Sequence, residues 1–493
     1  MPVDHSASWF GHPRGLAILF GAELWERFSY YGMRALLVLY VIGSLDRSAP
    51  EAYALYGVYG ALVYAFGVVG GAIAQRWLGE PRAIIAGGVL MAAGHLVMAL
   101  PWQGGLYWAL ALLCVGNGLF KPNVSSNVGA LYTEDDPRRT HAFYVFYMGI
   151  NLGAMLAPIV CGAVAERYGW HVGFGLAGVG MLFGLAVVIR GRRWLRPLAP
   201  EHAARLARPL APASAWALGL AIVATIPLCA LLLWRDAWGH AVIELVGVGV
   251  VLVLIAMAAR ERGPGRAKLI GLLVLMVFHT AFWAAFEQVG SSFTLLAEDH
   301  VDRRVAGMEI PASSLVAINA ALIIGLAPLV AWFWRELAAR GREPSTPAKF
   351  ALGLVLLGAG FLVFALAIAC GLDRGSVSLV ALLACYLLIT LGELCLSPIG
   401  LALVGRLAPA GASGFCMGAW FMTYALAHLI SAWIATLTAG TDAQGPRLAG
   451  YAEVFVQVGV VALGLALILV ALRGWLASKL EGDAQRSSDL PQS

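Results

Sequence analysis

The sequence predicts an all-α polytopic membrane protein with fourteen transmembrane helices. Of its 493 residues, 60% are hydrophobic and only 12% are charged, and the mean hydropathy is +0.80. Apolar runs of about 18 or more residues recur along almost the whole chain, and each can cross the hydrocarbon core of a bilayer as a helix. A soluble protein of this length would carry far more polar surface.

Breaks at proline, glycine and clustered charges separate the predicted helices. The first fourteen residues contain one Arg and no apolar core followed by a small-residue cleavage site, so we expect the first helix to remain as a span and not to be removed as a signal peptide. The fourteen helices are expected near residues 15–44, 50–78, 82–100, 104–131, 139–166, 171–190, 212–234, 240–260, 269–297, 311–338, 348–371, 377–405, 411–438 and 449–475.

The distribution of basic residues predicts the orientation. An even number of spans puts both termini on one side, and loops on that side hold 23 of the 33 Lys and Arg residues, against seven on the other side and three within spans. Because cytoplasmic loops are enriched in Lys and Arg, both termini are predicted to be cytoplasmic. We expect the plasma (inner) membrane as the location.

Two basic linkers divide the chain. Arg190–Pro212 is rich in Arg and Pro, and a shorter basic stretch, Arg260–Lys268, follows two helices later. Six helices precede this pair and six follow it. A 6 + 2 + 6 arrangement predicts the major-facilitator fold, with a substrate site at the midplane between two six-helix bundles. The predicted domains are 1–198, the linker with two extra helices at 199–266, and 267–493 with a short cytoplasmic tail.

The first predicted helix carries a stripe of polar side chains. At 100° per residue its acids, bases and tyrosines fall on one face. Charge inside a bilayer costs at least about 2.5–3.5 kcal/mol per group, so these side chains must face protein or water. The stripe indicates a transport path, although a ladder of structural salt bridges is the alternative. Its members are Glu23, Glu26, Arg27, Tyr30, Tyr31 and Arg34.

The two acids of this stripe suggest proton coupling. Glu23 and Arg27 are spaced i,i+4, so their charges can neutralise each other. Desolvation favours the protonated carboxyl, and a neighbouring Arg favours the charged one. A carboxylate balanced between these effects can exchange its proton when an anionic substrate draws the base away. We expect Glu23 or Glu26 to carry the coupled proton.

The fourth and fifth predicted helices add further polar side chains. Lys121 lies within the fourth helix, directly before Pro122, which removes a backbone hydrogen bond and can kink the helix. A structural ion pair is the alternative role for this lysine. Asn151 lies among apolar neighbours in the fifth helix, where it either joins helices or contacts a ligand.

Other function classes find little support. The seven cysteines are odd in number and lack CxxC spacing, so neither disulfides nor a metal site is expected. The sequence has no HExxH motif, clustered Ser/His/Asp or metal-spaced Cys/His set, which argues against an enzyme. We therefore expect no cofactor, no metal and no nucleic-acid partner.

Six sequence motifs are spread over both halves of the chain. They are ExxERFSYYG (Glu23–Gly32), GNGLFKPN (116–123), FYMGINLG (146–153), FWAAFEQVGSS (282–292), GELCLSPIGL (392–401) and MGAWFMT (417–423). These motifs, in this order, resemble those of the proton-dependent oligopeptide transporters, whose bacterial members also have two extra helices between the halves. The resemblance covers the full length of the chain.

The resemblance implies a clamp for the two ends of a peptide. Arg27 and Lys121 match the bases that receive the C-terminal carboxylate. Glu393, Asn151 and Asn319 match the residues that meet the N-terminal ammonium. The family usually has Asn-Pro where this chain has Asn319 followed by Ala, which leaves the local kink in question. Opposite charges at the two ends complement a zwitterion.

The resemblance also implies pocket residues. Glu287 is a lone acid near the outer half of its predicted helix, and from this height we expect it to pair with Arg34 as an outer gate that protonation of Glu287 releases. For Trp283 and Trp420, ordinary packing is the alternative to lining a side-chain pocket. No His occurs in the second helix, where some relatives use one for the proton, so proton transfer is assigned to carboxylates. The expected lining residues are Tyr30, Tyr31, Tyr64, Trp283, Ser397 and Trp420.

The predicted function is therefore proton-coupled symport of di- and tripeptides by alternating access. Its partners would be small peptides, protons and the lipid bilayer, with a functional monomer. The alternative is a major-facilitator carrier for another anion, such as nitrate or a carboxylate. Arg27 and Lys121 fit both readings, whereas Glu393 would repel an anion that lacks an ammonium group.

Overall fold

The structure is a computed structural model that describes residues 8–102, 104–133, 136–195, 212–409, 412–440 and 447–480. Fourteen helices of at least 20 residues lie within these ranges. Twelve are long and apolar enough to cross a membrane. The other two, α1 (Arg14–Gly43) and α4 (Gly105–Ala130), are equally long but carry the predicted polar side chains. The fourteen-helix prediction is confirmed; most of the linker after Leu195 and the tail after Leu480 lie outside the described residues.

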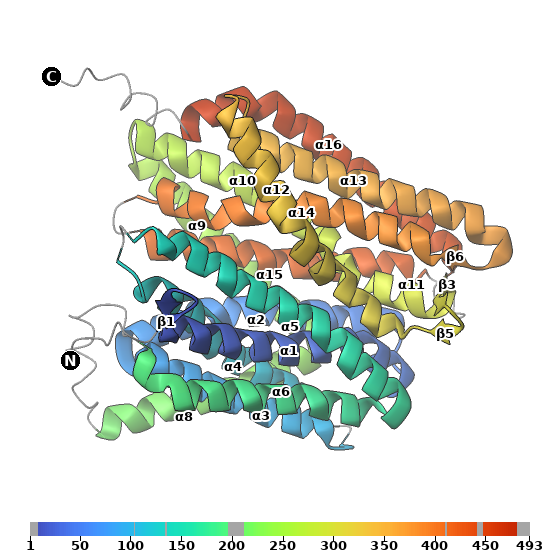
Figure 1. Cartoon of the computed structure of the whole chain (residues 1–493), viewed down its shortest axis with the longest axis horizontal. Helices are drawn as coiled ribbons and strands as arrows, with labels where there is room; N and C mark the ends of the chain where they lie inside the picture. Colours follow the sequence, from blue (N-terminus) through green and yellow to red (C-terminus); the bar gives the residue numbers. More distant parts are fainter. Residues whose placement is uncertain are drawn as a thin grey trace. The chain divides into compact units, whose positions relative to one another are not determined.

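Contacts divide the described chain into two compact units. The first comprises Met1–Arg47, Val58–Gly239 and Arg304–Ile324. In it α1 packs against α5 and α6, α3 packs against α4 and α6, and α4 also contacts α8, as the lower helices of Figure 1 show. Its further helices are α2 (Ala49–Ile73, from Val58), α3 (Glu80–Ala99), α5 (Arg138–Tyr168), α6 (Trp170–Gly191) and α8 (Pro212–Trp234).

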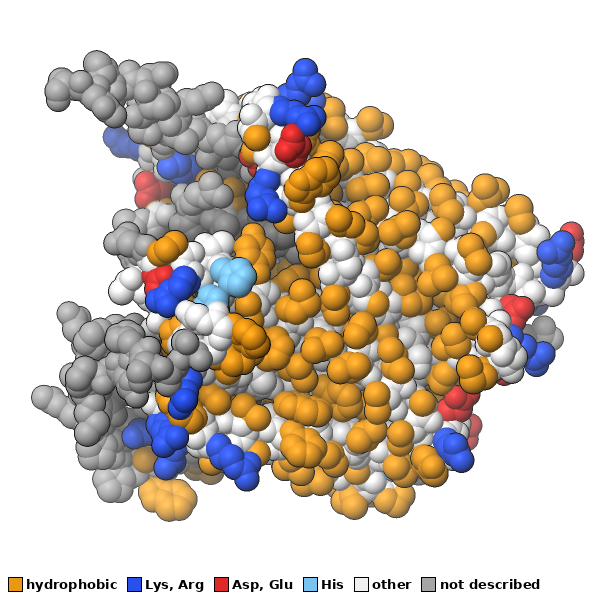
Figure 2. All heavy atoms as spheres, viewed as in Figure 1, with side chains coloured by type: hydrophobic (Ala, Val, Ile, Leu, Met, Phe, Trp, Pro, Cys, Tyr) orange, Lys and Arg blue, Asp and Glu red, His pale blue; other side chains and the backbone are white. Residues whose placement is uncertain are grey.

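The second unit comprises Ser48–Gly57, His240–Arg303 and Gly325–Ser493. In it α13 packs against α14 and α16, and α10 packs against α15. On the face in Figure 2, hydrophobic side chains cover the middle of the helices, while Lys and Arg gather toward helix ends. Its helices are α9 (Asp236–Arg260), α10 (Pro264–Phe286), α11 (Ser292–His300), α12 (Ala317–Ala339, from Gly325), α13 (Thr346–Gly371), α14 (Leu379–Leu407), α15 (Ser413–Thr438) and α16 (Leu448–Leu480).

Short strands occur only near helix ends within the described ranges. Strand β1 (Ser8–Trp9) pairs with β2 (His12–Pro13), and β4 (Arg304–Val305) pairs with β5 (Met308–Glu309), both antiparallel. The remaining pair, β3 (Val301–Asp302) with β6 (Val377–Ser378), is parallel. These pairs shape connections and add little to the helical core.

Two predicted helices are interrupted. The helix expected at 269–297 ends at Phe286, continues as a 3₁₀ turn over Glu287–Gly290, and resumes as α11. The Ser291 hydroxyl donates to the Glu287 carbonyl at 3.3 Å, and such side-chain bonds compete with helical ones. The second predicted helix passes into a π-helical turn at Ala74–Leu78 before Gly79, whose φ of 76° ends it.

Close helix contacts depend on glycine. A Cβ atom on Gly70 of α2 would lie 2.0 Å from the Gly118 carbonyl oxygen of α4, so only glycine permits this approach. Gly153 plays the same part between α5 and α1, because its Cβ would lie 2.3 Å from the Leu24 carbonyl oxygen. This second contact brings α5 against α1 beside the polar stripe.

A histidine cluster fastens the N-terminal hairpin to the first unit. His12 Nδ1 lies 2.8 Å from the Tyr132 hydroxyl, and His12 Nε2 lies 2.9 Å from His141 Nδ1, so the two imidazoles share a hydrogen bond. Arg138 donates to the Gly11 carbonyl at 3.0 Å and pairs with Asp136. Burial lowers the pKa of His12 below its usual 6.5, and the charges of His141 and Arg138 lower it further, against the opposing effect of Asp136.

This cluster predicts a pH-dependent attachment of the hairpin. Released His12 binds a proton near pH 6.5, whereas docked His12 resists protonation, so docking is fully stable above pH 6.5 and weakens as the pH falls below it. Hydrogen exchange of the Gly11 and His12 amides, corrected for intrinsic rates, should lose protection between pH 7.5 and 5.5. In His12→Gln the protection should vary little with pH. Equal pH dependence in both proteins would contradict the prediction.

Candidate functional site

Four charged side chains of the first unit form one buried cluster. Arg27 on α1 donates through Nε and Nη2 to the two carboxylate oxygens of Glu26, at 2.5 and 2.6 Å. The ammonium of Lys121 on α4 donates to Glu23 Oε1, which also lies 3.5 Å from Arg27 Nε. Both glutamates are 0% exposed. Two acids and two bases thus neutralise one another inside the membrane-spanning region.

The carboxylates of Glu26 and Glu23 differ in how many hydrogen-bond donors contact them. Glu26 has the two-pronged contact with Arg27 and a further hydrogen bond from Asn117 Nδ2 to Oε1, at 2.9 Å. Oε2 of Glu23 is buried and has no hydrogen-bond partner among the described residues. Glu26 is therefore held by more hydrogen-bond donors than Glu23.

Aromatic rings surround the guanidinium groups of α1. Arg27 Cζ lies 4.7 Å from the ring centroid of Tyr30 and 5.9 Å from that of Tyr31. Arg34 Cζ lies 5.9 Å from each of the same rings. Tyr30 also stacks on Tyr59 of α2, with centroids 6.4 Å apart. The predicted stripe is thus continuous from the carboxylates to Arg34, held by cation–π contacts.

The other predicted site residues of the first unit are buried or half-buried. Asn151 of α5 is buried, and its Nδ2 donates to the Tyr147 carbonyl of its own helix at 2.9 Å. Neither of its two predicted roles is decided by this bond. Tyr64 on α2 and Asn319 on α12 are half-buried. Lys121 is 30% exposed, so it is the cluster's most accessible charge.

In the second unit, Glu287 lies in a polar network. It is 5% exposed, and Oε2 lies 3.8 Å from Nδ1 of the buried His428. Beside it, Gln288 donates to the carbonyl and hydroxyl of Ser431 at 2.9 and 3.0 Å, which joins the turn after α10 to α15. Arg34 belongs to the other unit, so the predicted gate between Arg34 and Glu287 stays a prediction.

The predicted tryptophans meet around a histidine. Trp283 Nε1 donates to His279 Nε2 at 3.0 Å, and His279 Nδ1 lies 2.7 Å from the Thr423 hydroxyl. The Trp420 ring lies 4.3 Å from the His279 ring, centroid to centroid. Trp420 is 1% exposed and packs on Gly400, where an added Cβ would lie 2.6 Å from its ring.

Glu393 and Ser397 lie one turn apart on α14. Glu393 is 7% exposed and Ser397 is half-buried. A carboxyl group in the middle of a membrane-spanning helix points to function by its cost alone. No group of three or more His, Cys, Asp or Glu side chains suited to a metal ion occurs in the described part of the chain.

Sequence reasoning missed Asn117, His279 and His428. Asn117 had a usable signal, because it lies four residues before Lys121 and therefore on the same face of α4. His279 lies four residues before Trp283 on α10, a spacing that could have indicated their contact. Its contact with Thr423, and that of His428 with Glu287, join different helices, and pairing between helices is not encoded in the spacing along one of them.

The fold and the buried charges together define a polytopic membrane transporter. The POT family model matches residues 81–453. The chain is 35% identical to the "Peptide transporter YePEPT" of Yersinia enterocolitica, over 94% of both chains. It is 33% identical to the "Dipeptide and tripeptide permease A" of Proteus mirabilis, over 94% of this chain and 95% of that one.

A solved structure agrees with these relatives. A crystal structure of the peptide transporter POT in complex with sulfate matches with a TM-score of 0.84 and 36% identity, over 96% of this chain and 97% of that one. The chain belongs to the proton-dependent oligopeptide transporter (POT) family of the major facilitator superfamily. It is a transporter and not an enzyme, which confirms the predicted family, fold and class.

The cluster predicts a coupled effect on stability. Removing one partner of a buried ion pair costs about 3–5 kcal/mol, and we expect the lower end for Lys121→Ala because Lys121 is partly exposed. Adding Glu23→Gln removes the stranded charge and should restore part of the loss. Thermal unfolding of the purified single and double variants measures this interaction. Additive losses in the double variant would show that the two side chains are not energetically paired.

Proposed function

We propose that this protein is a proton-coupled symporter that imports di- and tripeptides across the bacterial inner membrane. Transport proceeds by alternating access, with both termini in the cytoplasm, and the proton electrochemical gradient drives it. The family and the named peptide carriers among its relatives support the substrate class. The buried cluster on α1 and α4 supports the coupling.

The charge balance of this cluster carries the proposal. Glu23, Glu26, Arg27 and Lys121 sum to zero net charge when all four are ionised. A peptide carboxylate that binds Arg27 and Lys121 adds one negative charge in a region of low dielectric. Protonation of one glutamate restores neutrality. Binding of the anionic end and binding of a proton therefore favour each other.

Glu23 is our choice for the coupled proton. Its bond to Lys121 competes directly with a carboxylate that draws the ammonium away, and its second oxygen has no donor among the residues that the structure describes. Glu26 keeps Arg27 and Asn117 in either case. Protonation of Glu23 frees Lys121 for the peptide, and departure of the peptide returns Lys121 to Glu23 and releases the proton.

The second unit supplies the opposite charge in this proposal. Glu393 binds the peptide ammonium together with Asn151 and Asn319, and the tyrosines, Trp283, Ser397 and Trp420 line the site. Arg34 and Glu287 act as the outer gate. Each proton moved through 100 mV supplies about 2.3 kcal/mol, which supports roughly fifty-fold accumulation of a neutral peptide. The protein acts as a monomer.

Two substitutions separate coupling from binding. In proteoliposomes, Lys121→Ala and Glu23→Gln should both abolish uptake of labelled dialanine driven by a pH gradient. Counterflow exchange without a gradient should persist in Glu23→Gln, because the neutral side chain still leaves Lys121 free to bind. Arg340→Ala removes an exposed ion pair and serves as the matched control with normal uptake. Gradient-driven uptake at the wild-type rate in both variants would exclude this mechanism.

A second experiment tests the peptide ammonium against the alternative of another anion. N-acetylation of dialanine removes the charge that Glu393 would bind, and a hydrogen bond to a charged group contributes about 1.5–3 kcal/mol, or roughly 10- to 100-fold in affinity. Wild-type protein should therefore discriminate against the acetylated peptide, and Glu393→Gln should not.

The control for this test is Glu336→Gln, which removes an exposed carboxylate and should keep the discrimination. If acetylation costs the same affinity in Glu393→Gln as in the wild type, Glu393 is not the ammonium partner. Competition by nitrate or simple carboxylates, with none by dialanine, would favour the other anion carrier.

A further inference from the structure

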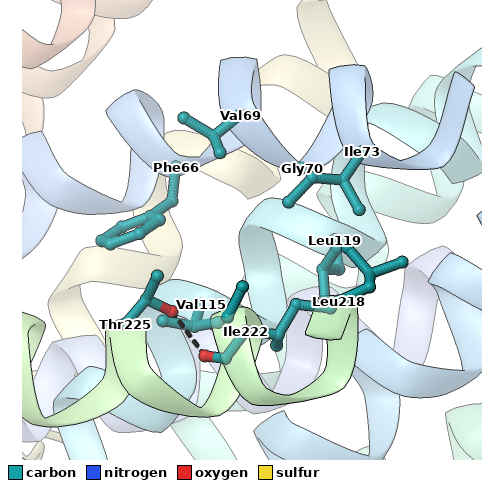
Figure 3. A pocket seen from close by; sticks show the side chains of 10 residues that line it. Phe66, Val69, Gly70, Ile73, Val115, Leu119, Leu218, Ile222 and Thr225 are labelled. Atoms are coloured by element: carbon teal, nitrogen blue, oxygen red, sulfur yellow. Dashed lines mark hydrogen bonds between the residues drawn. The ribbon is translucent and has the colours of Figure 1, made fainter. Parts of the chain in front are cut away.

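An apolar groove lies between α2, α4 and α8, away from the charged cluster. It has an empty volume of about 420 Å³, part of it open to the surroundings. Figure 3 shows Phe66, Val115 and Thr225 at one end and Ile73, Leu119 and Leu218 at the other. Phe66 and Ile73 are seven positions apart on α2, which gives the groove a length of about 10 Å.

The groove is suited to a hydrocarbon and unsuited to water. Thr225 is the one polar side chain among the described residues that line it, and the threonine hydroxyl already donates to the Ile222 carbonyl at 2.6 Å, drawn as the dashed line in Figure 3. A buried water needs two to four polar partners, which this lining does not offer. Left empty, the lining atoms would forfeit dispersion contacts, so an apolar occupant is favoured.

The position of the groove specifies which hydrocarbon. Two of its three helices, α2 and α8, are long and apolar enough to span a membrane, and α8 is exposed at Trp216, Leu220 and Val223. Lipid tails therefore surround its opening. The tight contact of Gly70 with Gly118 closes the groove on its inner side, so an occupant enters from the lipid side or from the helix ends.

One end of the groove leads to a basic membrane interface. Beyond Ile73 the chain enters the π-helical turn Ala74–Leu78, which exposes Arg76 and Trp77, and Arg82 is exposed at the start of α3. Glu80, the acidic residue between Arg76 and Arg82 in the sequence, is only 3% exposed, so the surface here presents positive charge. Exposed tryptophans at this end, Trp77 and Trp216, are typical of the headgroup level.

We propose that this groove binds one acyl chain of an anionic glycerophospholipid whose phosphate contacts Arg76. The acyl chain fills the space between α2, α4 and α8, and the headgroup lies at the end with Arg76 and Trp77. Clustered basic residues beside membrane helices select anionic lipids. The lipid thereby attaches the extra helix α8 to the first unit, which gives the additional helix pair a role outside peptide binding.

Two alanines on α8 make a matched pair for testing the acyl chain. Ala221 lines the groove, whereas Ala224, three residues further along α8, is also exposed but is not among the residues that line it. Ala221→Phe fills the groove, whereas Ala224→Phe adds the same ring elsewhere. Native mass spectrometry of the purified full-length protein, titrated with dioleoylphosphatidylglycerol, should show one retained lipid. Its affinity should fall at least tenfold in Ala221→Phe and stay unchanged in Ala224→Phe.

A second pair tests the headgroup. Arg76→Gln should weaken phosphatidylglycerol about five- to tenfold and leave phosphatidylcholine unchanged, while Arg167→Gln, at the far end of α5, should change neither. Equal lipid retention in Ala221→Phe and wild type would overturn the acyl-chain site. Equal binding of the two lipids, unaffected by Arg76→Gln, would overturn the headgroup contact. Dimers in place of lipid adducts would show that a second copy fills the groove. Dialanine uptake reports separately on the proposed function.

Discussion

The neutralisation of charge between α1 and α4 is the constraint on which the first unit depends. Two carboxylates that are 0% exposed would be prohibitively costly in a bilayer without Arg27, Lys121 and Asn117 beside them. This requirement fixes the rotation of both helices. It also explains why glycine is needed where α5 meets α1, because Gly153 brings that helix against Arg27 without adding bulk.

The sequence was sufficient for the helices and for the polar face of α1, because apolar length and 3.6-residue periodicity are local properties. The sequence was less informative about which charged side chains form ion pairs with one another. The spacing suggested that Glu23 pairs with Arg27, and these two side chains do lie 3.5 Å apart. It did not suggest that Arg27 makes its shorter, two-pronged contact with the adjacent Glu26, or that Glu23 also binds Lys121. The contact with Lys121 depends on how α4 approaches α1, which no pattern within either helix specifies.

Helix interruptions show the same limit. An apolar run predicts a continuous helix, but the run from 269 to 297 breaks where Glu287, Gln288 and two serines form their own hydrogen bonds. The Gln288 amide is held by Ser431 of α15, far along the sequence. Tertiary partners thus decide where a membrane helix ends, and the break places Glu287 beside His428.

Because the cluster has two acids and two bases, its net charge is zero only for certain combinations of bound proton and bound carboxylate. With no substrate, adding a proton leaves a net positive charge; with a bound carboxylate, withholding the proton leaves a net negative one. Each charged state is penalised in low dielectric, so the neutral states dominate. In the proposed mechanism, proton and carboxylate therefore enter and leave together, and thermodynamic linkage requires that each raise the affinity of the other by the same factor. The proposed coupling needs no separate proton relay, because it follows from electroneutrality within four side chains.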